Sequence, residues 1–180
     1  MVTDFNKLKV NLNFKIKVKH KTRAPAIKQD KVLTNLIQTK CLYENGKFYP
    51  AYCLNRDLHG VGTVENYTVD VDSLIDNNQV WRAVKNGYPY KSANDMGLES
   101  EFDAFAVTKF AIYCLIGQAD INLYTADEGD VEGQAMLRAL HNLVDIGLYG
   151  TDTFYDELKA TPIGDLVEDG NYYSITYKVS

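Results

Sequence analysis

The stretch "ESEFDAFAVTKFAIYCLI", residues 99–116, predicts one long helix with almost no charge. Several of its residues recur at the spacing of a single helix face, which indicates a stripe buried against other elements. The stripe comprises Phe102, Phe105, Lys109, Ile112 and Ile116. Lys109 lies at its centre and is the only charged residue between Asp103 and Asp120. A core built around this helix therefore has to accommodate one ammonium group.

The Lys109 ammonium has three possible outcomes in such a helix. Its apolar stem can lie along the core while the charge reaches water. It can instead find a partner, or lose its proton, because an unpaired buried charge is costly. Asp103 is a poor partner, since six residues along a helix place it on a different face. Periodicity alone leaves these outcomes open.

Two further helices are expected on either side of this one. Residues 74–87, "LIDNNQVWRAVKNG", predict a helix that is capped by Asp72 or Ser73 and ends at Gly87. Residues 129–150, "GDVEGQAMLRALHNLVDIGLYG", show apolar residues at helical spacing. Helices are thus expected to occupy the middle of the chain.

The two ends of the chain have strand character. Residues 7–19, "KLKVNLNFKIKVK", alternate strictly between apolar and polar, which predicts a half-buried strand guarded by lysines at a sheet edge. Residues 41–55 predict a hairpin around the favoured Asn-Gly turn at positions 45 and 46. Residues 66–72 and 170–179 predict further strands. The expected fold class is α+β, with a β-rich sandwich or barrel-like body and an inserted helical section.

The bulk composition limits the function. The chain of 180 residues is 46% hydrophobic, so a folded domain with a sizeable core is expected. A formal net charge of −5 argues against a nucleic-acid surface. No apolar run approaches the roughly 20 residues that cross a bilayer, so no membrane insertion of this segment is expected. One domain, residues 1–180, excised from a longer protein, is the predicted organisation.

The cysteines and acidic residues do not predict a cofactor or metal site. Cys41, Cys53 and Cys114 make an odd number, so at least one thiol stays outside any intramolecular disulfide. By parity alone, a Cys41–Cys114 disulfide would leave Cys53 free. No C-x-x-C occurs, and the histidines are scattered. Residues 125–133, "TADEGDVEG", lack calcium-loop spacing and indicate an acidic turn that begins a helix.

Three motifs, taken in order, carry a family resemblance. They are "AYCLNR" at 51–56, "VWRAVKNGYPY" at 80–90 and "AFAVTKFAIY" at 104–113. This order resembles that of thioester domains in Gram-positive surface adhesins and pilus-tip proteins. In that family the cysteine follows an aromatic residue, here Tyr52 before Cys53. A helix then ends in a Gly-Tyr-Pro turn, and a later helix carries Thr-Gln-x-Ala-Ile-Trp. The resemblance spans nearly the whole chain.

The departure from the family lies in the last motif. It reads Thr108, Lys109, Phe110, Ala111, Ile112, Tyr113. The family joins the cysteine sulfur to the glutamine side-chain carbonyl, with loss of ammonia, and the resulting thioester acylates a nucleophile of the host. Lysine brings an amine in place of that carbonyl. If Lys109 aligns with the glutamine, the family bond cannot form between Cys53 and Lys109, whereas Tyr113 keeps an aromatic ring in place of Trp.

The resemblance implies a bacterial cell-surface adhesion module that is secreted, extracellular and attached to the cell wall or a pilus. Its implied partner is a host or surface protein ligand, bound noncovalently because the Cys-Gln bond is absent. The implied role is binding and not enzymatic catalysis, and no cofactor is implied.

Other uses of the Cys53 and Lys109 pair are also open. An ammonium beside Cys53 would favour a thiolate, and oxidation would then give a disulfide, a sulfenic acid or a sulfur-oxygen-nitrogen bridge. Lys109 could instead pair with a carboxylate or form an isopeptide bond. Lys109 could also have been introduced to disable the site.

The alternative function is a thiol-dependent hydrolase or transferase. It would pair Cys53 with a histidine base. His59, in the Gly-rich loop that follows Cys53, is the more suitable candidate, and His141 is the other. Geometry has to bring nucleophile and base together for this reading to hold.

Overall fold

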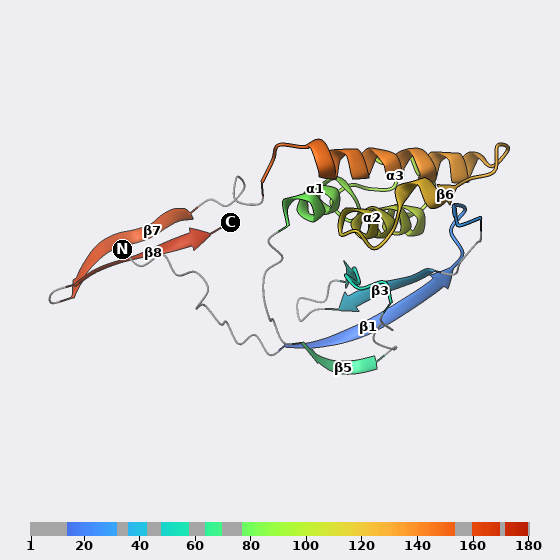
Figure 1. The fold of residues 1–180 in the computed structure, drawn as a ribbon. Helices are drawn as coiled ribbons and strands as arrows, with labels where there is room; N and C mark the ends of the chain where they lie inside the picture. Colours follow the sequence, from blue (N-terminus) through green and yellow to red (C-terminus); the bar gives the residue numbers. More distant parts are fainter. Residues whose placement is uncertain are drawn as a thin grey trace. The chain divides into compact units, whose positions relative to one another are not determined.

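The fold is described from a computed structural model (Figure 1). The described residues are 14–31, 36–42, 48–57, 64–69, 77–153, 160–169 and 172–179. They fall into two compact units, Met1–Gly150 and Thr151–Ser180. Strands lead into a helical section and strands follow it, so the predicted α+β class is confirmed. The prediction of one domain over residues 1–180 stays a prediction.

The first unit contains an antiparallel sheet with strand order β4-β3-β1-β5. Its strands are β1 Phe14–Arg23, β3 Leu36–Leu42, β4 Phe48–Ala51 and β5 Val64–Val69. β1 pairs with both β3 and β5 and is therefore an inner strand, so the predicted edge position is wrong. The physical reason is that alternation distinguishes the two faces of a strand and says nothing about its two edges. Residues 7–13 of the predicted strand lie outside the described residues.

The predicted hairpin is present as the β3–β4 pair. Its register pairs Leu42 with Phe48 and Thr39 with Ala51, while the predicted turn lies outside the described part of the chain. Continued two residues beyond Ala51, this register aligns Cys53 with Ile37. This alignment places Cys53 next to the start of β3.

The described residues include three α-helices, α1 Asn78–Asn86, α2 Glu101–Leu115 and α3 Val131–Tyr149. The predicted extents of α2 and α3 are confirmed, but α1 begins later than predicted. Asn77 caps α1, because its side chain accepts hydrogen bonds from the backbone N–H groups of Gln79 and Val80. The cap predicted at Asp72 or Ser73 is therefore wrong, and those two residues lie outside the described part of the chain. Capping preference could not decide this, because Asn is as good an N-cap as Asp or Ser.

Helix α2 forms the centre of the core. It contacts α1, α3 and β3, and in Figure 1 it lies between α3 and the sheet, with α1 beside it. Phe105, Val107, Ala111 and Ile112 point in different directions around the helix, yet each is 0% exposed. The apolar surface therefore extends around most of α2 and is wider than the single predicted stripe. Lys109 is half-buried within it.

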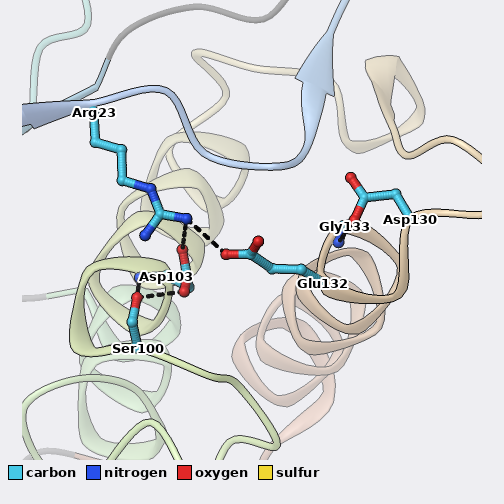
Figure 2. A network of polar contacts seen from close by, with 6 residues as sticks. All are labelled: Arg23, Ser100, Asp103, Asp130, Glu132 and Gly133. Carbon is cyan, nitrogen blue, oxygen red and sulfur yellow. Dashed lines mark hydrogen bonds and ion pairs between the residues drawn. The ribbon is translucent and has the colours of Figure 1, made fainter.

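The ends of α2 and α3 are tied to β1 by charge (Figure 2). The Arg23 guanidinium lies 2.8 Å from Glu132 and 3.9 Å from the fully buried Asp103. Ser100 caps α2, and its hydroxyl also donates a hydrogen bond to Asp103. The Ser100 hydroxyl accepts from the Asp103 N–H, which is the N-cap bond of this helix, and ties the Asp103 carboxylate to the same cap.

The acidic segment at 125–133 is a helix-initiating turn, as predicted. Asp130 caps α3 by accepting a hydrogen bond from the Gly133 N–H, and Asp127 lies 2.5 Å from the Lys28 ammonium. The described residues contain no cluster of three or more His, Cys, Asp or Glu suited to a metal ion. The short elements β2 Lys28–Gln29, η2 Ile121–Leu123 and β6 Tyr124–Thr125 complete this unit.

The second unit is a hairpin of β7 Ala160–Asp169 and β8 Tyr172–Val179. The strand predicted at 170–179 is thereby confirmed. Across both units, none of the described helices has the length and apolar character that spanning a bilayer requires.

Candidate functional site

Cys53 lies in a short loop that follows β4. The thiol is free and half-buried, and its Sγ donates a hydrogen bond to the Asn55 carbonyl oxygen at 2.9 Å. Leu54 and Asn55 beside it are exposed. A ligand can therefore approach the loop from solvent, while its own backbone holds the thiol.

Gln118 fixes this loop to the end of α2. Its Nε2 donates to the Leu54 carbonyl oxygen at 2.8 Å, and its Oε1 accepts from the Arg56 backbone N–H at 2.7 Å. Arg56 Nη1 completes the contact by donating to the Gln118 carbonyl oxygen at 3.3 Å. Sequence analysis did not predict this role, because a polar residue after a helix gives no signal of a partner 64 positions away.

Tyr52 anchors the residue before the cysteine. Its ring stacks on Phe105 of α2 with centroids 4.8 Å apart, and its hydroxyl donates to the Tyr88 carbonyl oxygen. Burial raises the pKa of Tyr52. The aromatic residue before Cys53 thus packs the loop onto α2.

Thr108 joins α2 to the turn after α1. Its hydroxyl donates to the Ala104 carbonyl oxygen at 2.8 Å and accepts from the Tyr88 N–H at 3.0 Å. A Cβ atom added at Gly87 would lie 2.5 Å from the Thr108 Oγ1, so this approach requires glycine. The three motifs found in the sequence therefore meet through Tyr52, Tyr88 and Thr108.

Lys109 points its amine toward the start of β3. Its Nζ lies 3.4 Å from the Ile37 carbonyl oxygen, and 6.0 Å and 5.8 Å from the ring centroids of Phe105 and Tyr113. Burial lowers the pKa of Lys109, and the neighbouring Cys53 partly offsets this effect. Lys109 thus combines two of the three outcomes predicted for its ammonium: the side chain is partly exposed, and its pKa is lowered.

Tyr113 completes the site on the next turn of α2. Burial is the main cause that raises its pKa to about 12, and Cys53 adds to the rise by its charge and by a hydrogen bond. Cys53 thus lies next to both Lys109 and Tyr113. Ala111 and Ile112 are fully buried and serve the core.

The described residues show neither predicted histidine base beside Cys53. His59 lies outside the described residues, and His141 is exposed on α3. The hydrolase reading with Cys53 and His59 stays a prediction.

The remaining thiols correct one expectation. Cys114, in the last turn of α2, is a free thiol, and burial raises its pKa to about 11. The Cys41–Cys114 disulfide suggested by parity is therefore wrong. An odd number of cysteines shows that at least one thiol is unpaired, but it does not show which cysteines lie close enough to pair.

Taken together, the site offers an amine, a thiol and a phenol. Two side-chain amides border the Cys53 loop: the Asn55 oxygen accepts from the Asp57 N–H at 3.0 Å, and the Gln118 oxygen accepts from the Arg56 N–H at 2.7 Å. The arrangement presents two half-buried nucleophiles, the Cys53 thiol and the Lys109 amine, at the edge of the core.

Comparison with known proteins agrees with this geometry. The family model of the thioester domain matches residues 50–147, more than half of the chain. The chain is similar to the thioester domain of the Enterococcus faecium TIE86 protein, with 17% identity, a TM-score of 0.57 and coverage of 93% of this chain and 61% of that one. It is also similar to the Bacillus anthracis TIE protein, with 19% identity, a TM-score of 0.57 and coverage of 93% and 31%.

These structural matches show a shared fold. The chain spans less than two thirds of the length of either protein. No curated protein matches the sequence.

Proposed function

The chain belongs to the thioester-domain family, and we propose from this premise that it is an adhesion module of a bacterial cell surface. Its proposed ligand is a protein of a host or of another surface. The proposed location is extracellular, on the cell wall or a pilus of a Gram-positive bacterium. Membership of a family of adhesion-type modules supports this role, and binding without enzymatic catalysis follows from it.

The proposed binding is noncovalent because of Lys109. We assign Cys53 and Lys109 to the positions of the bond-forming cysteine and glutamine. Tyr52 before Cys53 and Thr108 before Lys109 support the assignment, since both lock their neighbours into one site. An amine has no acyl carbon for a thiol to attack, so the pair cannot form the family's thioester.

Exposed apolar side chains near the site support a role in binding. Ile37 and Tyr49 lie on β3 and β4, and Leu54 follows Cys53. Their exposed fractions are 49%, 40% and 37%. Apolar side chains that gather at a protein surface are a feature of protein contact sites.

Intact mass and cell binding together test this function. The denatured mass of the purified chain is expected to equal the sequence mass, with and without methylamine. Fluorescently labelled chain is expected to bind fixed epithelial cells and to be released by hot detergent. Cys53→Ala should bind equally well, because the proposed contact needs no acyl bond.

Two results would contradict the proposal. One is a mass lowered by one ammonia and changed by methylamine, since that would reveal a thioester from another glutamine. The other is a detergent-resistant adduct on cells that disappears in Cys53→Ala.

A further inference from the structure

The Lys109 amine has no carboxylate partner among the described ion pairs. Around Nζ are a backbone carbonyl oxygen at 3.4 Å, two aromatic faces and the thiol of Cys53. None of the ion pairs within the described part of the chain includes Lys109, whereas Lys28 meets Asp127 at 2.5 Å. Lys109 therefore differs from a lysine that holds a structural ion pair.

These surroundings favour an amine that can react. Removing an ammonium from water without a carboxylate partner disfavours its charged form, in agreement with the lowered pKa of Lys109. A larger neutral fraction means a larger nucleophilic fraction, as for desolvated lysines that form Schiff bases. Because Lys109 is only half-buried, a reagent can still reach it.

We propose that Lys109 and Cys53 form a capture site for aldehydes. The Lys109 nitrogen attacks the aldehyde carbon and forms a carbinolamine, which loses one water to give an imine. The Cys53 sulfur then adds to the imine carbon, and the thiol proton passes to the nitrogen. One C=O bond is replaced by one C–N and one C–S bond, water is the only product released, and no oxidant or reductant is required.

The geometry gives each group a separate part in this capture. Leu54, next to Cys53 and 37% exposed, offers an apolar contact to the substituent of the aldehyde, while the buried Phe105 and Tyr113 rings line the amine from the core side. The Asn55 carbonyl oxygen accepts a hydrogen bond from the Cys53 thiol at 2.9 Å and holds the thiol in the loop. From there Cys53 acts electrostatically on both the amine and Tyr113. Aromatic and other apolar aldehydes are therefore the expected class. This activity goes beyond the proposed function and rests on it only in using the same site.

Benzaldehyde with sodium cyanoborohydride tests the proposal on the full chain. Reduction fixes each imine as a benzylamine, and peptide mapping then measures the labelling rate at every lysine. Lys85 is a matched control, because its Nζ also lies over an aromatic ring, 4.8 Å from the Trp81 centroid. Lys109 is expected to be labelled several-fold faster than Lys85, because its lowered pKa leaves a larger neutral fraction. Equal rates would overturn the proposal.

The rate at which iodoacetamide alkylates Cys53 tests the role of the thiol separately. Without reductant, benzaldehyde is expected to slow the alkylation of Cys53 by iodoacetamide in the wild type and in Lys85→Arg. Lys109→Arg and Lys109→Met are expected to lose this protection. Protection that persists in both Lys109 variants would contradict the paired capture.

The experiment separates this proposal from the proposed function. If neither Lys109 variant folds by circular dichroism, the lysine-by-lysine rates of the wild type decide the question alone. The mass of the untreated wild type reports on the thioester independently of any aldehyde. Slow labelling of Lys109 with an unchanged untreated mass would reject aldehyde capture and leave the adhesion proposal standing.

Discussion

Thr108 and Gly87 show how single residues hold the site together. The Thr108 hydroxyl bonds both its own helix and the turn that follows α1. Gly87 permits this because it has no Cβ, and the space that a Cβ would need is occupied by the Thr108 side chain. Together they fix α2 against the turn after α1, directly beside Lys109 in sequence.

Gly87→Ala is expected to destabilise the fold by about 1–3 kcal/mol, as overpacking of a filled core does. The added methyl would meet Thr108 Oγ1 at 2.5 Å and the Ala83 carbonyl oxygen at 2.8 Å. Urea unfolding measures the effect. Gly129→Ala is the control, since nothing lies within 4 Å of a Cβ added there. Equal stabilities of the two variants would show that Gly87 is not constrained.

Gln118→Ala is expected to raise the rate at which iodoacetamide alkylates Cys53. The substitution removes the two hydrogen bonds that hold Leu54 and Arg56, so the loop opens more often. A loss of about 1 kcal/mol in global stability is expected as well. Gln134→Ala removes hydrogen bonds from Ala126 and Asp127, away from the loop, and should leave Cys53 unchanged. A Cys53 rate that rises equally in both variants would speak against a local role.

The helices and strands were predictable to different degrees. α2 and α3 follow from uninterrupted apolar spacing, which depends only on local sequence. The start of α1 could not be predicted in this way. Several residues able to cap a helix precede it, and the fold determines that Asn77 is the one that caps α1. The inner position of β1 depends on pairing with β3 and β5, which come later in the chain. The alternation of apolar and polar residues in β1 gives no information about that pairing.

The charge network between β1, α2 and α3 makes stability depend on pH. Burial and the nearby Asp103 raise the pKa of Glu132, while Arg23 opposes the rise. A carboxyl group whose pKa is higher in the folded state binds more protons there than in the unfolded chain. Its contribution therefore falls as pH rises from the ordinary value of 4.5 through the raised value.

Glu132→Gln is expected to flatten this fall in stability with rising pH. Urea unfolding between about pH 4 and pH 7 measures it, since a glutamine does not titrate. Glu128→Gln removes an exposed carboxylate from the same turn and serves as the control. If the pH profile of Glu132→Gln matches that of the wild type, the carboxylate pair does not set the slope.

For the whole molecule, the fold class and the family could be predicted, but the assembly of the site could not. The strand-helix-strand order and three motifs in series pointed to the thioester domain. The contacts that join those motifs, from Tyr52 to Phe105 and from Tyr88 to Thr108, connect residues far apart in sequence. Gln118 and the free Cys114 likewise became visible only in the fold.

The central claim is that Lys109 occupies the place of the bond-forming glutamine beside Cys53. The denatured intact mass of Lys109→Gln tests it most directly. The claim predicts a mass one ammonia below the sequence mass, increased by methylamine through opening of the thioester, and a full sequence mass when Cys53→Ala is added. A folded Lys109→Gln protein that keeps its full sequence mass would contradict the claim.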